Sequence, residues 1–149
     1  MKRRTFLQGS MAAGIAAIAA GAGLLTPRAV LAAYPKAQFE AESVDAALGG
    51  SFEHSDDIRI KAPDIAENGA VVPVKVTTGI TGITAISILA KENGTPLTSK
   101  FVLGPGADGE VSTRIKMGRT SDVIAVVEAD GKRYANSKEL KVTIGGCGG

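Results

Sequence analysis

The chain of 149 residues contains no Trp, one Cys and one His. A single cysteine cannot form an internal disulfide, so core packing and backbone pairing must hold the fold together. A single imidazole is a poor basis for a metal site, and the polar stretch 53–57 around His54 has no standard ligand spacing. We therefore expect no metal there and interpret that stretch as a solvated loop.

The first 33 residues have the pattern of an export signal. Arg3 and Arg4 precede Phe6 and Leu7, and an Ala- and Gly-rich apolar run over 11–25 follows. The arginine pair with Phe and Leu is typical of the twin-arginine signal. A permanent membrane span needs about 20 strongly apolar residues, and a buried helix would not begin with three consecutive cations. We expect export to a bacterial periplasm by the twin-arginine route, with cleavage after residue 32 or 33.

Removal of this leader changes the charge of the protein. The leader holds four of the 17 basic residues and no acidic residue, which leaves 13 basic against 15 acidic side chains and a net charge of −2. The basic pI of 8.8 thus belongs to the leader. No basic patch is visible in the rest of the sequence, and aromatic residues are few, so nucleic-acid binding is disfavoured.

Residues 34–144 are enough for one domain with its own core. Apolar residues at helical spacing predict one short amphipathic helix over 37–48, which ends at Gly49 and Gly50. Alternating or β-branched segments separated by turn residues then predict about seven strands. They cover residues 58–61, 71–77, 83–89, 97–103, 110–117, 121–128 and 133–144. Asn93-Gly94 predicts a turn, and Pro73 predicts an edge position or a bulge.

This series of short strands predicts an all-β fold, an antiparallel β-sandwich of immunoglobulin-like type. The disulfide and the buried Trp of antibody domains are absent, so the prediction concerns architecture alone. A small open barrel is the alternative. The stretch 79–82 with its two glycines is too short for a phosphate-binding loop, and we interpret it as a β-hairpin or a bulge.

The chain ends in Gly145, Gly146, Cys147, Gly148 and Gly149, which place its only thiol between two glycine pairs. Five residues span at most about 17 Å, and glycine adds no bulk. We therefore expect a flexible arm (145–149) that presents one sulfur to other proteins. The terminal carboxylate should raise the pKa of the thiol above its usual value of about 8.5. A partner must therefore activate the sulfur, and Lys138 and Lys141 on the preceding strand are interpreted as surface charges.

The leader, the predicted sandwich and the terminal Gly-Gly-Cys-Gly-Gly together resemble the SoxY family, the sulfur-carrying subunits of bacterial thiosulfate oxidation. The segment 62–69 also resembles a segment common in that family. The resemblance implies a carrier without a cofactor of its own, with Cys147 as the covalent attachment point for sulfur and its four flanking glycines as a swinging arm.

The resemblance also implies partners. SoxZ would form a heterodimer with the chain and be exported with it. The haem enzyme SoxAX would couple thiosulfate to the cysteine, the metal-dependent hydrolase SoxB would release sulfate, and the sulfane dehydrogenase SoxCD, where present, would oxidise the remaining sulfur.

Three other functions compete with a carrier. An exported structural protein would dimerise through a disulfide between two copies of Cys147. A terminal conjugation tag would react through the carboxylate of Gly149, which requires ATP in the cytoplasm and conflicts with the export signal. A stand-alone enzyme is least favoured, because the sequence contains no set of residues that suggests a base, a metal or an oxyanion site.

Overall fold

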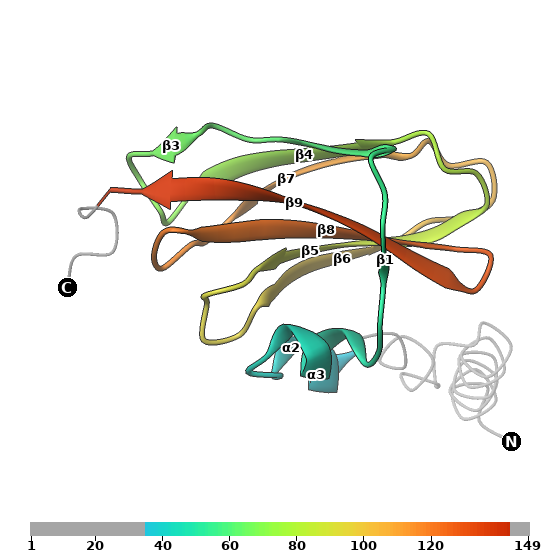
Figure 1. The fold of residues 1–149 in the computed structure, drawn as a ribbon, viewed down its shortest axis with the longest axis horizontal. Helices are drawn as coiled ribbons and strands as arrows, with labels where there is room; N and C mark the ends of the chain where they lie inside the picture. Colours follow the sequence, from blue (N-terminus) through green and yellow to red (C-terminus); the bar gives the residue numbers. More distant parts are fainter. Residues whose placement is uncertain (1–34, 144–149) are drawn as a thin grey trace, which may run out of the picture. The chain divides into compact units, whose positions relative to one another are not determined.

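The computed structural model describes residues 35–143 (Figure 1). Within them lie two short helices, α2 (Lys36–Phe39) and α3 (Val44–Leu48), followed by nine strands. The strands are β1 (Glu53–His54), β2 (Ile58–Lys61), β3 (Ile65–Ala66), β4 (Val72–Thr78), β5 (Ile83–Ala90), β6 (Leu97–Val102), β7 (Glu110–Ile115), β8 (Ser121–Ala129) and β9 (Lys132–Val142). Neither helix of this region has the length and apolarity that a membrane crossing needs.

The strands form two sheets, as the sequence predicts. The larger sheet has the order β1-β9-β8-β5-β6, with β3 also paired to β9, and the smaller has the order β2-β4-β7. The long strands of both sheets pair antiparallel, whereas the two-residue strands β1 and β3 pair parallel with β9. The seven predicted strands correspond to β2 and β4–β9, so the prediction of a two-sheet β-sandwich is confirmed.

The core lies between the sheets and follows from the alternation along the strands. Val72, Val74 and Val76 of β4 are buried and belong to one apolar cluster with Ile86 and Ile88 of β5. Side chains of a strand point alternately to its two faces, so this cluster takes every second residue. The burial of these faces against each other holds the two sheets together without a disulfide.

A second apolar cluster covers the other face of the larger sheet. Ala47 and Leu48 of α3 pack there with Leu89 of β5 and Val126 of β8. The strand β5 is thus buried on both faces, which explains why its sequence is apolar over nearly its whole length. In Figure 1 both helices lie on the side of the larger sheet that faces away from β4 and β7.

The N-terminal helix differs from its prediction. Instead of one helix over 37–48, two helices are separated by residues 40–43. Ser43 has an extended backbone, and its side chain accepts a hydrogen bond from the N–H of Ala46 at 3.1 Å, which caps a new helix. The predicted end is confirmed, because Gly49 adopts a left-handed conformation with φ 64° as the C-cap.

The prediction for Pro73 is confirmed, and the prediction for residues 79–82 needs correction. Pro73 lies in β4, the central strand of its sheet, but the pairing with β2 ends at Lys75. Only β7 flanks Pro73, so the residue occupies a local edge position. Residues 79–82 form no hairpin, since they cross from β4 in one sheet to β5 in the other; a register shift follows between Ile83 and Ala85.

Candidate functional site

The last described residues of β9 are held by the chain segment 62–69, which we call the β3 segment. Ile65 and Ala66 of its two-residue strand pair in parallel with Lys141 and Val142. The N–H of Lys141 donates to the carbonyl of Asp64 at 3.0 Å, and the N–H of Thr143 donates to that of Ala66 at 3.1 Å. Figure 1 shows β3 beside the end of β9. The position of the chain is thus fixed by backbone hydrogen bonds up to residue 143.

A lysine of β9 fastens the start of the same segment. The ammonium of Lys138 donates to the carbonyl of Ala62 at 2.7 Å and pairs with the carboxylate of Asp64 at 2.9 Å. The hydrogen bond from Lys138, and then its positive charge, lower the pKa of the Asp64 carboxyl. Asp64 is largely exposed, so the ion pair adds little by itself, and the bond to Ala62 and the β3–β9 pairing hold the segment.

At Gly69, the last residue of the β3 segment, the backbone lies directly against the backbone of Met117. The N–H of Met117 donates to the Gly69 carbonyl at 2.7 Å. A Cβ atom at position 69 would collide with the Met117 carbonyl and would come within 2.8 Å of a methyl group of Val142. The β3 segment therefore contacts both the end of β9 and the loop after β7, and glycine is required where it passes between them.

The sequence indicated the β3 segment only through its likeness to a family segment, and it did not indicate its place in the fold. Lys138, interpreted as a surface charge, instead ties this segment to β9. Lys141 is exposed, and its backbone takes part in the same pairing. The contacts link positions more than 70 residues apart, which no local pattern reveals.

The predicted attachment residue Cys147 and the arm glycines Gly145, Gly146, Gly148 and Gly149 lie outside the described residues. The same is true of the export residues Arg3, Arg4, Phe6 and Leu7. What the structure describes is the support from which the arm would begin, two residues beyond Thr143.

The polar stretch around His54 is not a simple loop, because Glu53 and His54 pair with β9 as β1. The imidazole of His54 lies 3.1 Å from the Asp56 carboxylate, and both side chains are exposed. Within residues 35–143 no group of three or more His, Cys, Asp or Glu side chains could hold a metal ion.

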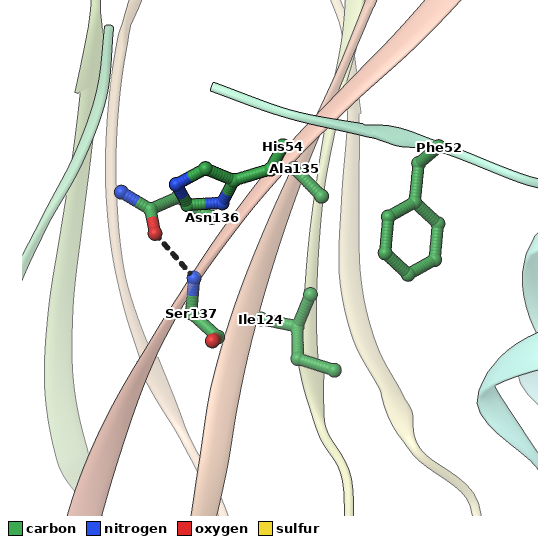
Figure 2. Close-up of a pocket in the computed structure, with 6 residues that line it drawn as sticks. All are labelled: Phe52, His54, Ile124, Ala135, Asn136 and Ser137. Carbon is green, nitrogen blue, oxygen red and sulfur yellow. Dashed lines mark hydrogen bonds between the residues drawn. The ribbon is translucent and has the colours of Figure 1, made fainter. Parts of the chain in front are cut away.

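A small pocket lies next to His54 on the outer face of β8 and β9 (Figure 2). Its volume of about 190 Å³ is below the usual range of roughly 300–1,000 Å³ for small-molecule sites. Asn136 at its edge is engaged in structure, since its side chain donates to the Ile58 carbonyl at 2.8 Å and accepts from the N–H of Ser137 at 2.8 Å. Because the pocket is small and the polar groups of Asn136 are already hydrogen-bonded within the fold, the pocket does not suggest a binding or catalytic site.

Comparison with known proteins shows which family this chain resembles. Residues 44–147 match the family of the sulfur oxidation protein SoxY. The solved structure of the sulfur carrier protein SoxY from Chlorobium limicola f thiosulfatophilum is similar, with 48% identity and a TM-score of 0.59 over 66% of this chain and 92% of that chain. A search of curated proteins found no match.

Two other solved structures have remote similarity. The reeler domain of human F-spondin has 12% identity and a TM-score of 0.43, over 61% of this chain and 92% of its own. A chain from a structure that concerns T cell specificity and activation by the bacterial superantigen toxic shock syndrome toxin-1 has 9% identity and a TM-score of 0.42. It covers 58% of this chain and 99% of its own length. Both are too remote to bear on function.

Proposed function

Because the chain belongs to the SoxY family of sulfur carrier proteins, we propose that Cys147 is the residue that bears the sulfur. The observation that carries the proposal is the extent of the family match, which continues from the described domain through residue 147. The match thus includes the only thiol of the chain. Members of this family are carriers and not enzymes, so the chemistry on the thiol belongs to partner proteins.

In the proposed cycle, the Cys147 thiolate and thiosulfate form an S–S bond and release two electrons, which SoxAX accepts. The product is a cysteine S-thiosulfonate. Water, directed by SoxB, then breaks the bond between the outer sulfur and the sulfane sulfur, which releases sulfate and two protons and leaves a persulfide on Cys147. Where SoxCD is present, it accepts six electrons from that sulfane sulfur while three water molecules supply oxygen and release six protons, which leaves a sulfonate group on the Cys147 sulfur. A second hydrolysis by SoxB then releases sulfate and two protons and regenerates the thiolate. The haem and the metals belong to the partners.

The support for a swinging arm is the combination of a fixed root and glycines beyond it. Backbone bonds to the β3 segment fix the chain up to Thr143, and the arm begins at Gly145. A tether of at most about 17 Å keeps the sulfur near the docked enzyme, and tethering gives a high local concentration without free diffusion of the intermediate. Glycines on both sides of Cys147 add no side-chain bulk, which suits entry into a narrow channel.

The same proposal includes the export route of the carrier and its assembly with a partner subunit. Residues 1–33 act as a twin-arginine leader, 34–144 as the carrier domain and 145–149 as the arm, so the mature protein acts in the periplasm. SoxZ, the heterodimer partner, would cross with it, because that route carries folded proteins. Neither statement depends on the adduct chemistry, and each can be tested by fractionation and co-purification.

The decisive experiment is an intact mass of the mature protein, purified from the periplasm of cells that oxidise thiosulfate. We expect added masses of sulfane and thiosulfonate groups that map to the Cys147 peptide and disappear on reduction. The Cys147→Ser variant should carry none of them and should not support thiosulfate oxidation. A bare thiol, or only a symmetric disulfide between two chains, would contradict the carrier function and favour a disulfide-linked structural dimer.

A further inference from the structure

The outer face of the smaller sheet is basic, although no basic patch is visible in the sequence. Along β2 and β4 the residues that point away from the core alternate with buried ones. The same alternation continues on β7. The outward side chains include four cations, Arg59, Lys61, Lys75 and Arg114. They lie within three strands but are spread over more than 50 positions of the chain, so only the pairing of the strands brings them onto one surface.

The register places these charges close together. Lys61 lies directly opposite Lys75, Arg59 lies opposite Thr77, and Arg114 lies opposite Pro73. One carboxylate shares the face, since Glu110 pairs with the ammonium of Lys75 at 2.7 Å. With four cations and one carboxylate the face has a net charge of +3. The mature chain has 13 basic and 15 acidic residues, so nine basic and fourteen acidic residues remain elsewhere, a net charge of −5.

Stability does not account for this concentration of charge. Two cations directly opposite each other on adjacent strands, such as Lys61 and Lys75, destabilise a sheet. Arg59, Lys61 and Arg114 are exposed, and Glu110 contacts Lys75 but cannot neutralise four cations. A positive face on an acidic domain therefore fits an interaction that recognises negative charge.

One end of the basic face adjoins the support of the arm. Val72 and Ile115, at that end of β4 and β7, are paired. The loop that follows β7 contacts the β3 segment through Met117 and Gly69. A shallow depression lined by Pro73, Ser112, Thr113 and Arg114 lies at the same end. A protein seated on this face would thus be next to the root of the arm.

We propose that the outer face of the smaller sheet is a docking surface for the acidic surface of an enzyme that acts on the arm. This rests on the proposed carrier function. The occupant is a protein because the cationic end of the face meets the arm root. The outward residues of the three strands include no aromatic side chain on which nucleic-acid bases could stack, and no large apolar residue that would insert into a lipid surface.

The test uses charge reversal at two positions and a matched control. Arg59→Glu with Lys61→Glu alters the basic face, and places a carboxylate opposite Lys75, so the folded state should be as stable as before. Lys36→Glu with Lys132→Glu makes the same change in net charge at exposed positions outside these strands and outside the loop that adjoins the arm root. Each mature variant is co-purified with SoxZ, and its rate of association with SoxAX and with SoxB is measured at low and at high salt.

We expect the face variant to associate at least about tenfold more slowly with one of the two enzymes at low ionic strength, and the difference to shrink at high salt. The control should stay within about twofold of the original. Rates within twofold for both enzymes would overturn the proposal. It would also be overturned if the variant lost only binding to anionic lipid vesicles or to nucleic acid, or only self-association. An intact mass on the same samples separates this outcome from failure of the carrier function, which would leave Cys147 without adducts in every variant.

Discussion

Thr143 donates its backbone N–H to the carbonyl of Ala66 at 3.1 Å, so the last described residue is bonded to a strand 77 positions earlier. A two-residue strand is too short to be stable alone, so β3 forms only because it pairs with β9. In return β3 stabilises the end of β9, whose pairing with its other neighbour, β8, ends at Leu140. The β3 segment (62–69) thus fixes the end of β9 up to Thr143, two residues before the glycine arm begins.

The Gly69→Ala variant should be less stable by about 1–3 kcal/mol in urea unfolding, because the new methyl group overlaps the Met117 carbonyl and a methyl group of Val142. Loss of this packing should also loosen the end of β9, which faster amide exchange at Lys141 and Thr143 would report. Gly104→Ala is the control, since a Cβ there has open space. Equal stability of the two variants would show that the close approach at Gly69 is not required.

The ion pair between Asp64 and Lys138 predicts a pH dependence of stability. Lys138 lowers the pKa of Asp64 in the folded state, so folding favours the ionised carboxylate. The contribution is complete above the unfolded pKa of about 3.9 and is lost as the pH falls through the lower folded value. Asp64→Asn should therefore be slightly less stable than the original protein at neutral pH, and the two stabilities should converge below about pH 4.

Parallel urea titrations at several pH values measure this difference. Asp108→Asn, at an exposed position outside the strands, is the matched control and should show a small difference that does not vary with pH. A gap between Asp64→Asn and the original protein that stayed constant from neutral to about pH 2.5 would contradict the assignment of the carboxylate to this pair.

The sequence predicts the seven longer strands well because each has its own pattern of alternation or β-branching and its own turns. Ile58–Lys61 is reproduced to the residue. The short strands β1 and β3 have no such pattern, because two residues show no period and their partner, β9, is far along the chain. Their existence depends on tertiary contacts, which a local reading of the sequence does not contain.

The basic face was missed for a related reason. Lys61 and Lys75 are 14 positions apart in the sequence and become direct neighbours only through the antiparallel register of β2 and β4. A search for a basic patch along the chain finds isolated cations between acidic and apolar residues. The helix break at residues 40–43 is different, since Ser43 is a recognisable cap residue; the helical spacing of the apolar residues simply concealed it.

Ser87 provides a prediction about the covered face of the larger sheet. Its side chain is buried, and its hydroxyl has no hydrogen-bond partner among the described residues. An unpaired buried hydroxyl carries a desolvation cost, so Ser87→Ala should raise the free energy of unfolding by about 1 kcal/mol. Ser112→Ala, at an exposed position of β7, should leave it unchanged. A Ser87→Ala protein less stable than the original would mean that the hydroxyl has a partner in solution.

The threading of the arm predicts that bulk beside the thiol blocks turnover without harm to the fold. Gly146→Val or Gly148→Val adds a branched side chain next to Cys147, and misplacement of the sulfur in a narrow channel should lower kcat/KM for thiosulfate oxidation by about 100-fold. The melting temperature should not change, because the proposed arm (145–149) is separate from the carrier domain (34–144).

Gly94→Val serves as the control for these two variants. Its position lies in the turn between β5 and β6, where a Cβ meets open space, so both activity and stability should be retained. Intact masses of the arm variants then show at which step the cycle fails. A bare thiol places the block at loading, whereas accumulated thiosulfonate places it at hydrolysis. Normal thiosulfate oxidation by Gly146→Val and Gly148→Val, at normal protein levels, would mean that the arm does not enter a narrow channel.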